Sequence, residues 1–211
     1  MSGLQASRRR VALTFDAEHP DRPALTGTTE ALLDRLAERA IRASFFVQGR
    51  WAEAFPETVG RIVADGHLVG SHSHYHARMP LLTDAGLAAD LADASAAIEA
   101  AAGVSPKPWF RCPFGAGADD ERVLAGIAAA GYRHVGWHVS ADDWEPTRGG
   151  DVISADIVDG VMRREDETVV LLHAWPAAML VAFDSIVARL TDSGAQFIRV
   201  DELGDPPVGI A

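Results

Sequence analysis

The sequence predicts an α/β protein whose parallel strands form a barrel with helices on the outside. Short apolar segments alternate along the chain with longer segments that repeat apolar residues at helical spacing. Polar and ionisable residues follow several of the short segments, at the strand ends where βα barrels place their sites. We therefore favour a barrel over an open, doubly wound sheet.

Seven segments are expected to be strands because they are short, mostly apolar and bounded by turn residues. A helical segment separates each strand from the next, which is the connection that parallel strands require. The expected strands are residues 11–15, 43–47, 67–70, 108–110, 133–139, 168–172 and 196–200.

The segments between these strands are expected to be helices. Leu32, Leu33 and Leu36 share one face of the first helix, which Thr28 or Thr29 is expected to cap. A proline at the start of the second helix and a glycine after its end mark its bounds. The expected helices are residues 28–41, 56–64, 84 to about 103, 120–130, 154–164 and 176–192.

The composition is typical of one soluble globular domain. The 211 residues include 48% hydrophobic and 23% charged residues, which are ordinary proportions for a domain with a substantial core. We expect the domain to span residues 11–203, between an N-terminal tail over 1–10 and a C-terminal tail over 204–211 at the surface. Cys112 is the one cysteine, so an intrachain disulfide is impossible.

Charge and hydropathy limit the partners that we expect. The net charge of −11 argues against nucleic acid or an anionic membrane as the main partner. No apolar run reaches the roughly 18 residues of a transmembrane helix, and residues 1–10 do not resemble a signal peptide. We therefore expect no membrane insertion and a cytoplasmic location. The sequence does not indicate the oligomeric state.

The first two reactive stretches combine carboxylates with histidines. Asp16 and Glu18 leave the first strand two residues apart, so in an extended segment they share a face. His72 and His76 are four residues apart, so one helical turn would place both imidazoles on one side. Two imidazoles and one carboxylate are a common catalytic zinc set. An exposed acidic turn and a histidine-rich surface loop are the alternative interpretations; His74 points elsewhere on this geometry.

Three further stretches carry single reactive groups. Arg111 can pair with a carboxylate through two hydrogen bonds or form a plain structural salt bridge. Asp143 and Trp144 can supply an acidic partner and an apolar wall. His173 follows a buried strand, where a histidine suits proton transfer but is more often a core residue. Cys112 is interpreted as a small buried hydrophobic residue.

In chain order these stretches resemble the motifs of the polysaccharide deacetylases, the NodB-homology domain of carbohydrate esterase family 4. The resemblance runs from about residue 11 to 203. Ala17 stands where the family has its metal-binding aspartate, so Glu18 is expected to replace it; Ser140 and Ala174 stand where Asp is usual. The family motifs are matched as follows: Thr-Phe-Asp-Asp-Gly by residues 14–18, His-Ser/Thr-x-x-His by 72–76, Arg-x-Pro-Tyr/Phe by 111–114, Asp-Trp by 143–144 and Leu-x-His by 171–173.

The resemblance implies a deformed (β/α) barrel and the hydrolysis of an N-acetyl group on an amino sugar, with release of acetate. It implies a divalent metal cofactor held by Glu18, His72 and His76, and zinc is the metal that we expect. An N-acetylated sugar would be the substrate and the main partner.

The resemblance also implies the roles of the remaining site residues. Asp16 would take the proton from water, oriented by Arg111. His173 would protonate the leaving amine, with Asp143 as its partner. The backbone N–H of Phe114 would stabilise the oxyanion, and Phe114 would also contact the substrate. Trp144 would pack beside the acetyl methyl group.

Two other functions remain open from the sequence. One is a metal-independent C–N hydrolase of a ureide or another amide on the same fold, as in allantoinase-like relatives. The other is a non-catalytic, carbohydrate-binding descendant, against which the presence of Asp16, Arg111 and His173 argues. Metal analysis and a screen for acetate release would separate the three functions.

Overall fold

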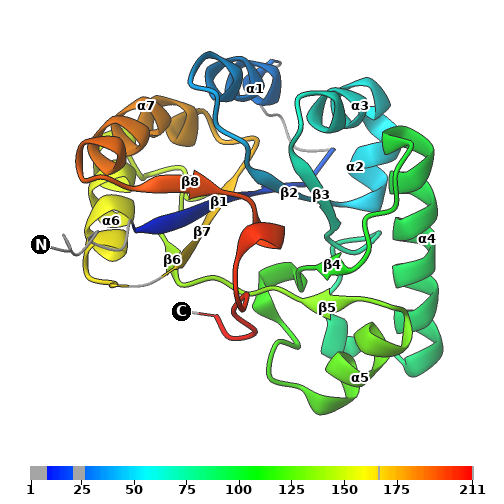
Figure 1. The fold of residues 1–211 in the computed structure, drawn as a ribbon. Coiled ribbons are helices and arrows are strands. Elements are labelled where there is room, and N and C mark those ends of the chain that lie inside the picture. The colour runs from blue at the N-terminus through cyan, green and yellow to red at the C-terminus, as the bar shows by residue number, and fades with distance from the viewer. Residues whose placement is uncertain (1–8, 21–26, 166, 211) are drawn as a thin grey trace, which may run out of the picture.

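A curled parallel sheet surrounded by helices forms the protein (Figure 1). The computed structural model describes residues 9–20, 27–165 and 167–210, so most of the predicted tail over 1–10 lies outside the described residues. Within these residues the sheet has eight strands, in the order β5-β4-β3-β2-β1-β7-β6, with β8 also on β1. Every pairing is parallel, which confirms the predicted fold class of a deformed α/β barrel. The strands are β1 (Arg10–Ala17), β2 (Ser44–Val47), β3 (Leu68–Ser71), β4 (Trp109–Phe110), β5 (Arg133–His134), β6 (Val139–Ser140), β7 (Thr168–His173) and β8 (Gln196–Ile198).

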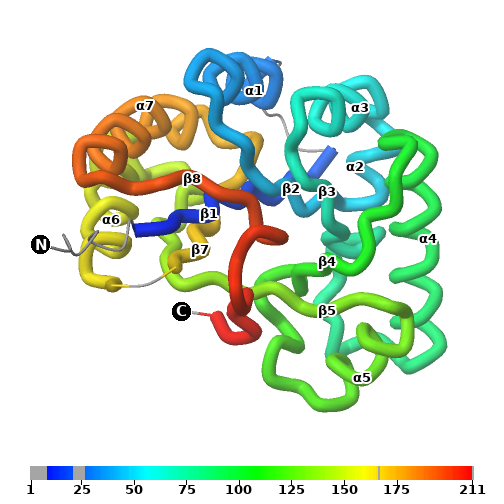
Figure 2. The backbone as a smooth tube through the Cα atoms, viewed as in Figure 1, coloured from blue at the N-terminus to red at the C-terminus, as the bar shows by residue number. Residues whose placement is uncertain are grey.

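Helices cover the outside of the sheet. In Figures 1 and 2, α6 and α7 pack together on one side of β1, and α2, α3 and α4 pack together on the other. Among the described residues, no helix combines the length and the apolar character needed to cross a membrane. The helices are α1 (Thr28–Glu38), α2 (Gly49–Ala54), α3 (Pro56–Ala64), α4 (Asp84–Ala102), α5 (Glu121–Ala129), α6 (Gly150–Met162) and α7 (Ala177–Asp192).

Strand β1 lies at the centre of the sheet and has three neighbours. β7 pairs with most of its length, β2 with its C-terminal half and β8 with its N-terminal half. All of its residues from Val11 to Ala17 are buried, as expected of a central parallel strand. The register places Asp16 opposite His173, the last residue of β7. Both side chains therefore reach the C-terminal edge of the sheet on neighbouring strands.

The predicted strand over residues 133–139 is wrong, because the chain forms two short strands, β5 and β6, and leaves the sheet between them. A Cβ atom at Gly136 would collide with Gly209 O, so the C-terminal tail passes directly against this backbone. The N–H groups of Gly136 and Trp137 donate to Pro207 O and Gly209 O at 2.7 and 3.2 Å. Hydrogen bonds to the tail thus replace strand pairing here.

The C-terminal tail lies at the surface, as expected, but it is bound to the barrel. In Figure 2 the red end of the chain runs from β8 towards the connection between β5 and β6. Ile210 forms a bridge with Trp137, and its side chain packs against Gly115. The tail therefore supports two loops at the C-terminal edge of the sheet.

The first helix differs from its prediction at both ends. α1 ends at Glu38 instead of near residue 41, because the chain turns at Ala40, where φ is 52°. Neither Thr28 nor Thr29 caps the helix, since both lie inside it and the N-cap residue is Gly27.

Two other helices also differ from the sequence-based expectation. α6 begins at Gly150, four residues before the predicted start at Ser154, whose hydroxyl instead bonds Ser185 on α7 at 2.8 Å. α2 was not predicted, because six residues are too few to show helical periodicity. Its start is fixed by tertiary hydrogen bonds to the loop after β3.

That loop carries His72 and His76, and it is not the helical turn that the spacing predicted. Ser73 and His76 have positive φ values of 66° and 58°. The loop is held instead by Asp90 on α4, whose two carboxylate oxygens accept the N–H groups of His74 and Tyr75 at 3.0 and 3.1 Å.

The start of α2 holds the same loop from its other side. Gly49 and Arg50 donate their N–H groups to Ser73 O and His74 O at 2.9 and 3.3 Å. A Cβ atom at Gly49 would collide with the His74 ring, so glycine is required there. Two helices therefore impose the loop conformation, and His74 points away from His72 and His76, as the sequence indicated.

Two buried histidines outside the cavity have structural roles. His67 Nδ1 accepts the Ala43 N–H at 3.0 Å and joins the starts of β2 and β3. His134 Nδ1 accepts the Cys112 N–H at 3.3 Å. Burial lowers the pKa of each imidazole to about 4, so both are neutral in the folded protein at neutral pH.

These histidines predict a loss of stability in mild acid. In the unfolded chain a histidine binds a proton near pH 6.5, whereas each of these binds one in the folded state only near pH 4. Stability is therefore lost as pH falls below 6.5, by about 2 kcal/mol per histidine at pH 5. Urea unfolding measures the free energy of unfolding at pH 7.5 and at pH 5. The decrease in this free energy between the two pH values should be about 2 kcal/mol smaller in His67→Gln than in the wild type. An equal loss in both proteins would contradict this role of His67.

Removing the carboxylate beneath the His72–His76 loop should destabilise the protein. Asp90 is 4% exposed, and Asp90→Ala leaves two N–H groups without their charged acceptor. We expect a loss of about 2–5 kcal/mol in the free energy of unfolding, measured by urea denaturation. Asp93→Ala, at an exposed position on the same helix, is the matched control and should change stability by less than about 0.5 kcal/mol. Equal stabilities of the two variants would show that Asp90 does not hold the loop.

Candidate active site

A cavity of about 320 Å³ opens at the C-terminal edge of the sheet. It gathers residues from motifs that are far apart in the sequence, whereas Arg111 and Asp143 lie buried behind its wall. Its predicted members are Asp16, Glu18, His72, His76, Phe114, Trp144 and His173, and it also includes His19, Trp137 and Trp175.

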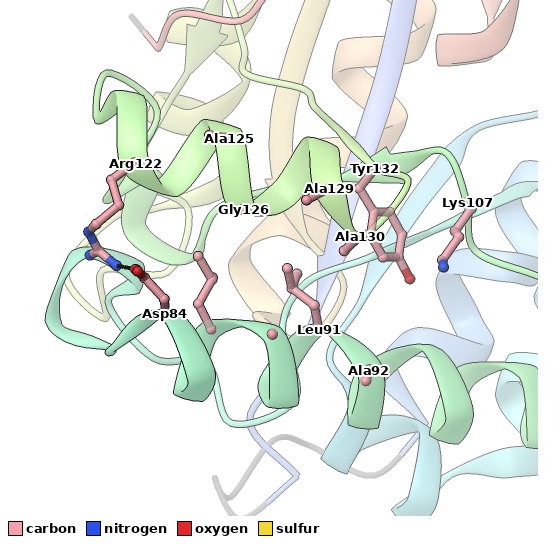
Figure 3. Close-up of a pocket in the computed structure, with 12 residues that line it drawn as sticks. Asp84, Leu91, Ala92, Lys107, Arg122, Ala125, Gly126, Ala129, Ala130 and Tyr132 are labelled. Atoms are coloured by element: carbon pink, nitrogen blue, oxygen red, sulfur yellow. Dashed lines mark hydrogen bonds and ion pairs between the residues drawn. The ribbon is translucent and has the colours of Figure 1, made fainter.

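A larger cavity of about 640 Å³ lies elsewhere, between α4 and α5 (Figure 3). Leucine and alanine side chains make up most of its wall. The Arg122–Asp84 ion pair stands at one end, and Lys107 and Tyr132 stand at the other. None of the predicted site residues lines it, and no group of reactive side chains converges on it. The smaller cavity is therefore the candidate active site.

Arg111 is fully buried and holds Asp16 in place. Its Nη1 donates to Asp16 Oδ1 at 2.8 Å and to Thr14 Oγ1 at 2.9 Å. Nε and Nη2 donate to the carbonyl oxygens of Val135 and Gly136, each at 3.2 Å. The predicted pair with a carboxylate is confirmed, although it uses one oxygen and not two. Asp16 Oδ2 stays free of Arg111 and lies 3.5 Å from His72 Nε2.

Glu18 shares the cavity with Asp16, as the two-residue spacing predicted. Ala17 between them is buried in the hydrophobic core, on the opposite face of the chain. Glu18 therefore occupies the place where a second carboxylate can serve the site.

Three imidazoles surround the Glu18 carboxylate. His72 Nε2 lies 3.2 Å from Glu18 Oε2, which His76 Nε2 also contacts, and His19 Nε2 lies 3.0 Å from Oε1. Burial raises the pKa of Glu18, but hydrogen bonds with the three histidines and the nearby His173 outweigh it, so the pKa lies well below its usual value. Glu18 is an ionised carboxylate at neutral pH.

The ring of His72 is oriented by a backbone carbonyl. Its Nδ1 lies 3.0 Å from Arg111 O, which can only accept, so Nδ1 carries the hydrogen. Once the ring is neutral, as a metal ligand must be, its lone pair lies on Nε2, which faces Glu18 and Asp16. A backbone carbonyl that accepts from the other ring nitrogen is a usual orienting partner of a metal-binding histidine. The donor set therefore fits a divalent ion.

One group of three residues could hold a metal ion through closely spaced atoms, and it differs in one residue from the predicted ligands Glu18, His72 and His76. Glu18, His19 and His76 offer atoms that all lie within 4.8 Å of one another. His72, the predicted member, contacts the same Glu18 oxygen as His76. His19 was not among the predicted site residues, although its place directly after Glu18 was a signal.

His173 is held by Asp143 through two hydrogen bonds. Its Nδ1 lies 2.7 Å from Asp143 Oδ1, and its backbone N–H donates to Oδ2 at 2.8 Å. Burial lowers the pKa of His173, but Asp143, Glu18 and Asp16 oppose it and raise the pKa to about 9. Asp143 is 1% exposed, whereas the neighbouring Asp142 is exposed and makes no such contact among the described residues.

Aromatic side chains form the mouth of the cavity. Trp144 and Phe114 are 43% and 52% exposed. The Phe114 ring meets His76 edge to face at 4.4 Å, and the Arg78 guanidinium lies over it at 4.4 Å. Trp175 lies 6.0 Å from His173, ring to ring. Trp175 was not among the predicted site residues, although its position two residues after His173 was a signal.

Cys112 takes the structural role that the sequence indicated, and His67 also has a structural role. Cys112 is completely buried, and burial raises the pKa of its thiol to about 12. His67 bonds a backbone N–H and does not reach the cavity.

Comparisons with known proteins show which family the chain resembles. Residues 3–135 match the family model described as polysaccharide deacetylase. A peptidoglycan-N-acetylglucosamine deacetylase of Bacillus cereus is 29% identical over 203 residues, which cover 93% of this chain and 69% of that protein. A chitooligosaccharide deacetylase of Sinorhizobium fredii is 36% identical over 164 residues, which cover 77% of this chain and 71% of that protein.

A solved structure shares both the fold and part of the sequence. It is the family 4 carbohydrate esterase from Streptomyces lividans in complex with acetate. The TM-score is 0.77 at 30% identity, over 89% of this chain and 90% of that chain. The fold, the motif order and these likenesses agree: the chain belongs to the polysaccharide deacetylase family, within carbohydrate esterase family 4.

Proposed function

We propose that the protein is a metal-dependent hydrolase that removes N-acetyl groups from an amino sugar or an N-acetylated saccharide and releases acetate. One observation carries the proposal. Asp16 and His173 face one cavity from neighbouring strands, each held by a buried partner, and the cluster of Glu18 and imidazoles lies against both. A base, an acid and a metal site are the three parts that this hydrolysis needs.

The metal would be held by Glu18, His72 and His76, the set implied by the family motifs. Their chemistry fits zinc, because an ionised carboxylate and two neutral imidazoles are its common catalytic ligands. A bound divalent ion would polarise the acetyl carbonyl and make a nearby water a better nucleophile.

Asp16 would act as the base. Arg111 occupies its Oδ1, so Oδ2 is the atom available to take a proton from the attacking water. The water oxygen joins the acetyl carbon, and the C–N bond then breaks. The backbone N–H of Phe114 would donate to the oxyanion that forms between these events.

His173 would act as the acid. Asp143 fixes its Nδ1, so Nε2 faces the cavity, 3.8 Å from Glu18 Oε1. With a pKa of about 9 it is protonated at neutral pH, and it can deliver that proton to the leaving nitrogen. The products are acetate and a free amine.

The substrate class follows from the cavity mouth and from the relatives. Trp144 and Phe114 offer exposed apolar surface at the opening, which suits the acetyl methyl and the ring that carries it. The relatives named above act on peptidoglycan and on chitooligosaccharides, as their names state. We therefore propose an N-acetylated saccharide; a cytoplasmic location remains a prediction.

Two alternative functions make different predictions. A metal-independent hydrolase of a ureide would act on its substrate after removal of metal. A non-catalytic saccharide-binding protein would release no acetate. The ionised Glu18 among three imidazoles favours the metal-dependent enzyme over both.

Separate substitutions of the two carboxylates test their roles. Asp16→Asn should keep zinc and lower acetate release by about 10²–10⁴-fold, because the base is lost while an oxygen remains for Arg111. Glu18→Gln should lower zinc affinity first. Metal content and acetate release are measured on the same preparations, with Asp142→Asn, an exposed carboxylate on the cavity, as the control. If Asp16→Asn empties the site and Glu18→Gln stays loaded, the assignment is reversed.

The acid role of His173 predicts a dependence on the leaving group. His173→Ala should lower the hydrolysis of an N-acetyl amide by about 10²–10⁴-fold, because the amine leaves only after protonation. An activated aryl acetate, whose leaving group needs no proton, should be hydrolysed almost as fast as by the wild type. Asp143→Asn should show the same pattern in weaker form. Equal losses on both substrates would assign His173 a role other than the acid.

A further inference from the structure

His19 is held beside the candidate metal site by a buried side chain. It follows Glu18 directly and has a φ of 58°. Its backbone N–H donates to Gln48 Oε1 at 2.9 Å, and the Gln48 N–H donates to Ala17 O, also at 2.9 Å. Gln48 is 4% exposed, so its side chain forms a fixed support for the turn after β1. The position of the His19 backbone is thereby set.

The His19 ring points into the cluster and not out to solvent. Its side chain is 21% exposed, and Nε2 lies 3.0 Å from Glu18 Oε1. The ring meets His76 at a centroid distance of 4.6 Å and Trp175 at 6.1 Å, edge to face in both cases. The ring therefore lies between Glu18 and His76 of the first two motifs on one side and Trp175 on the other.

The two oxygens of Glu18 have different neighbours. His72 and His76 contact Oε2, whereas His19 contacts Oε1. Atoms of Glu18, His19 and His76 lie within 4.8 Å of one another, close enough to share one ion. The family motifs assign no role to the residue at this position.

We propose that His19 is a fourth protein ligand of the metal, beside Glu18, His72 and His76, an inference that rests on the metal-dependent function proposed above. The ion would then be held by three imidazole nitrogens and one carboxylate oxygen. A nitrogen-rich set favours zinc, cobalt or nickel over magnesium, calcium or manganese, which prefer oxygen ligands. The chain would thus bind a narrower range of metals, and bind them more tightly, than two imidazoles and a carboxylate allow.

Metal binding to apo-protein tests this proposal without use of enzyme activity. Zinc affinity is measured by competition with a chromophoric chelator, and the cobalt(II) absorption spectrum reports the ligands. His19→Ala should weaken zinc binding by more than about 10-fold. Its cobalt bands should move to longer wavelength, because water replaces an imidazole of stronger ligand field. The preference for zinc over manganese should fall as well.

Two further variants make each result decisive. Ser140→Ala, at another position on the cavity, should match the wild type in affinity and spectrum. His72→Ala should weaken zinc binding; zinc bound at wild-type affinity there would overturn the proposed metal centre itself. His19 is not a ligand if His72→Ala fails to hold zinc but His19→Ala keeps the wild-type cobalt spectrum. This conclusion holds even if His19→Ala binds zinc more weakly, because the loss of the His19 contact can act through Glu18 alone.

Discussion

The buried ion pair between Arg111 and Asp16 is the interaction on which the site depends. The guanidinium is fully buried, and its donors bind Asp16, Thr14 and two backbone carbonyls after β5. Loss of either charge would leave the other buried and unpaired, at a cost of about 3–5 kcal/mol. The backbone carbonyl of the same arginine orients His72. One residue therefore positions both the proposed base and a proposed metal ligand.

Parallel pairing explains why motifs so distant in sequence meet. The N–H groups of His72 and Arg111 donate to the last residues of the neighbouring strands β2 and β3, both at 2.9 Å. The N–H group of Ala174 donates to the last but one residue of β1 at 3.0 Å, so these strands end at nearly the same level. At the end of β1, alternation sends Ala17 into the core and leaves Asp16 and Glu18 on the cavity side. The departure from the family motif thus keeps a second carboxylate in the site, moved by one residue along the chain. Buried partners behind the cavity wall then fix the reactive atoms.

Local pattern was sufficient for the fold class and for most of the elements, because long helices carry a periodic signal and buried strands are short apolar runs bounded by turn residues. It failed where tertiary contacts decide the structure. The break at Gly136 depends on the C-terminal tail, and the short helix α2 depends on the loop that it supports. The family motifs identified the cavity residues, but not His19, which only the folding of the turn onto Gln48 brings to Glu18.

The most direct test of metal-dependent deacetylation is acetate release from an N-acetylated chitooligosaccharide by one protein preparation in three states: as purified, stripped by chelator, and reloaded with one equivalent of zinc. We predict that stripping abolishes acetate release and that the equivalent of zinc restores it, while circular dichroism shows the same fold throughout. Acetate release at the full rate by the stripped protein would contradict the metal-dependent mechanism. No release in any state, on this substrate and on other N-acetylated sugars, would contradict the deacetylase function itself.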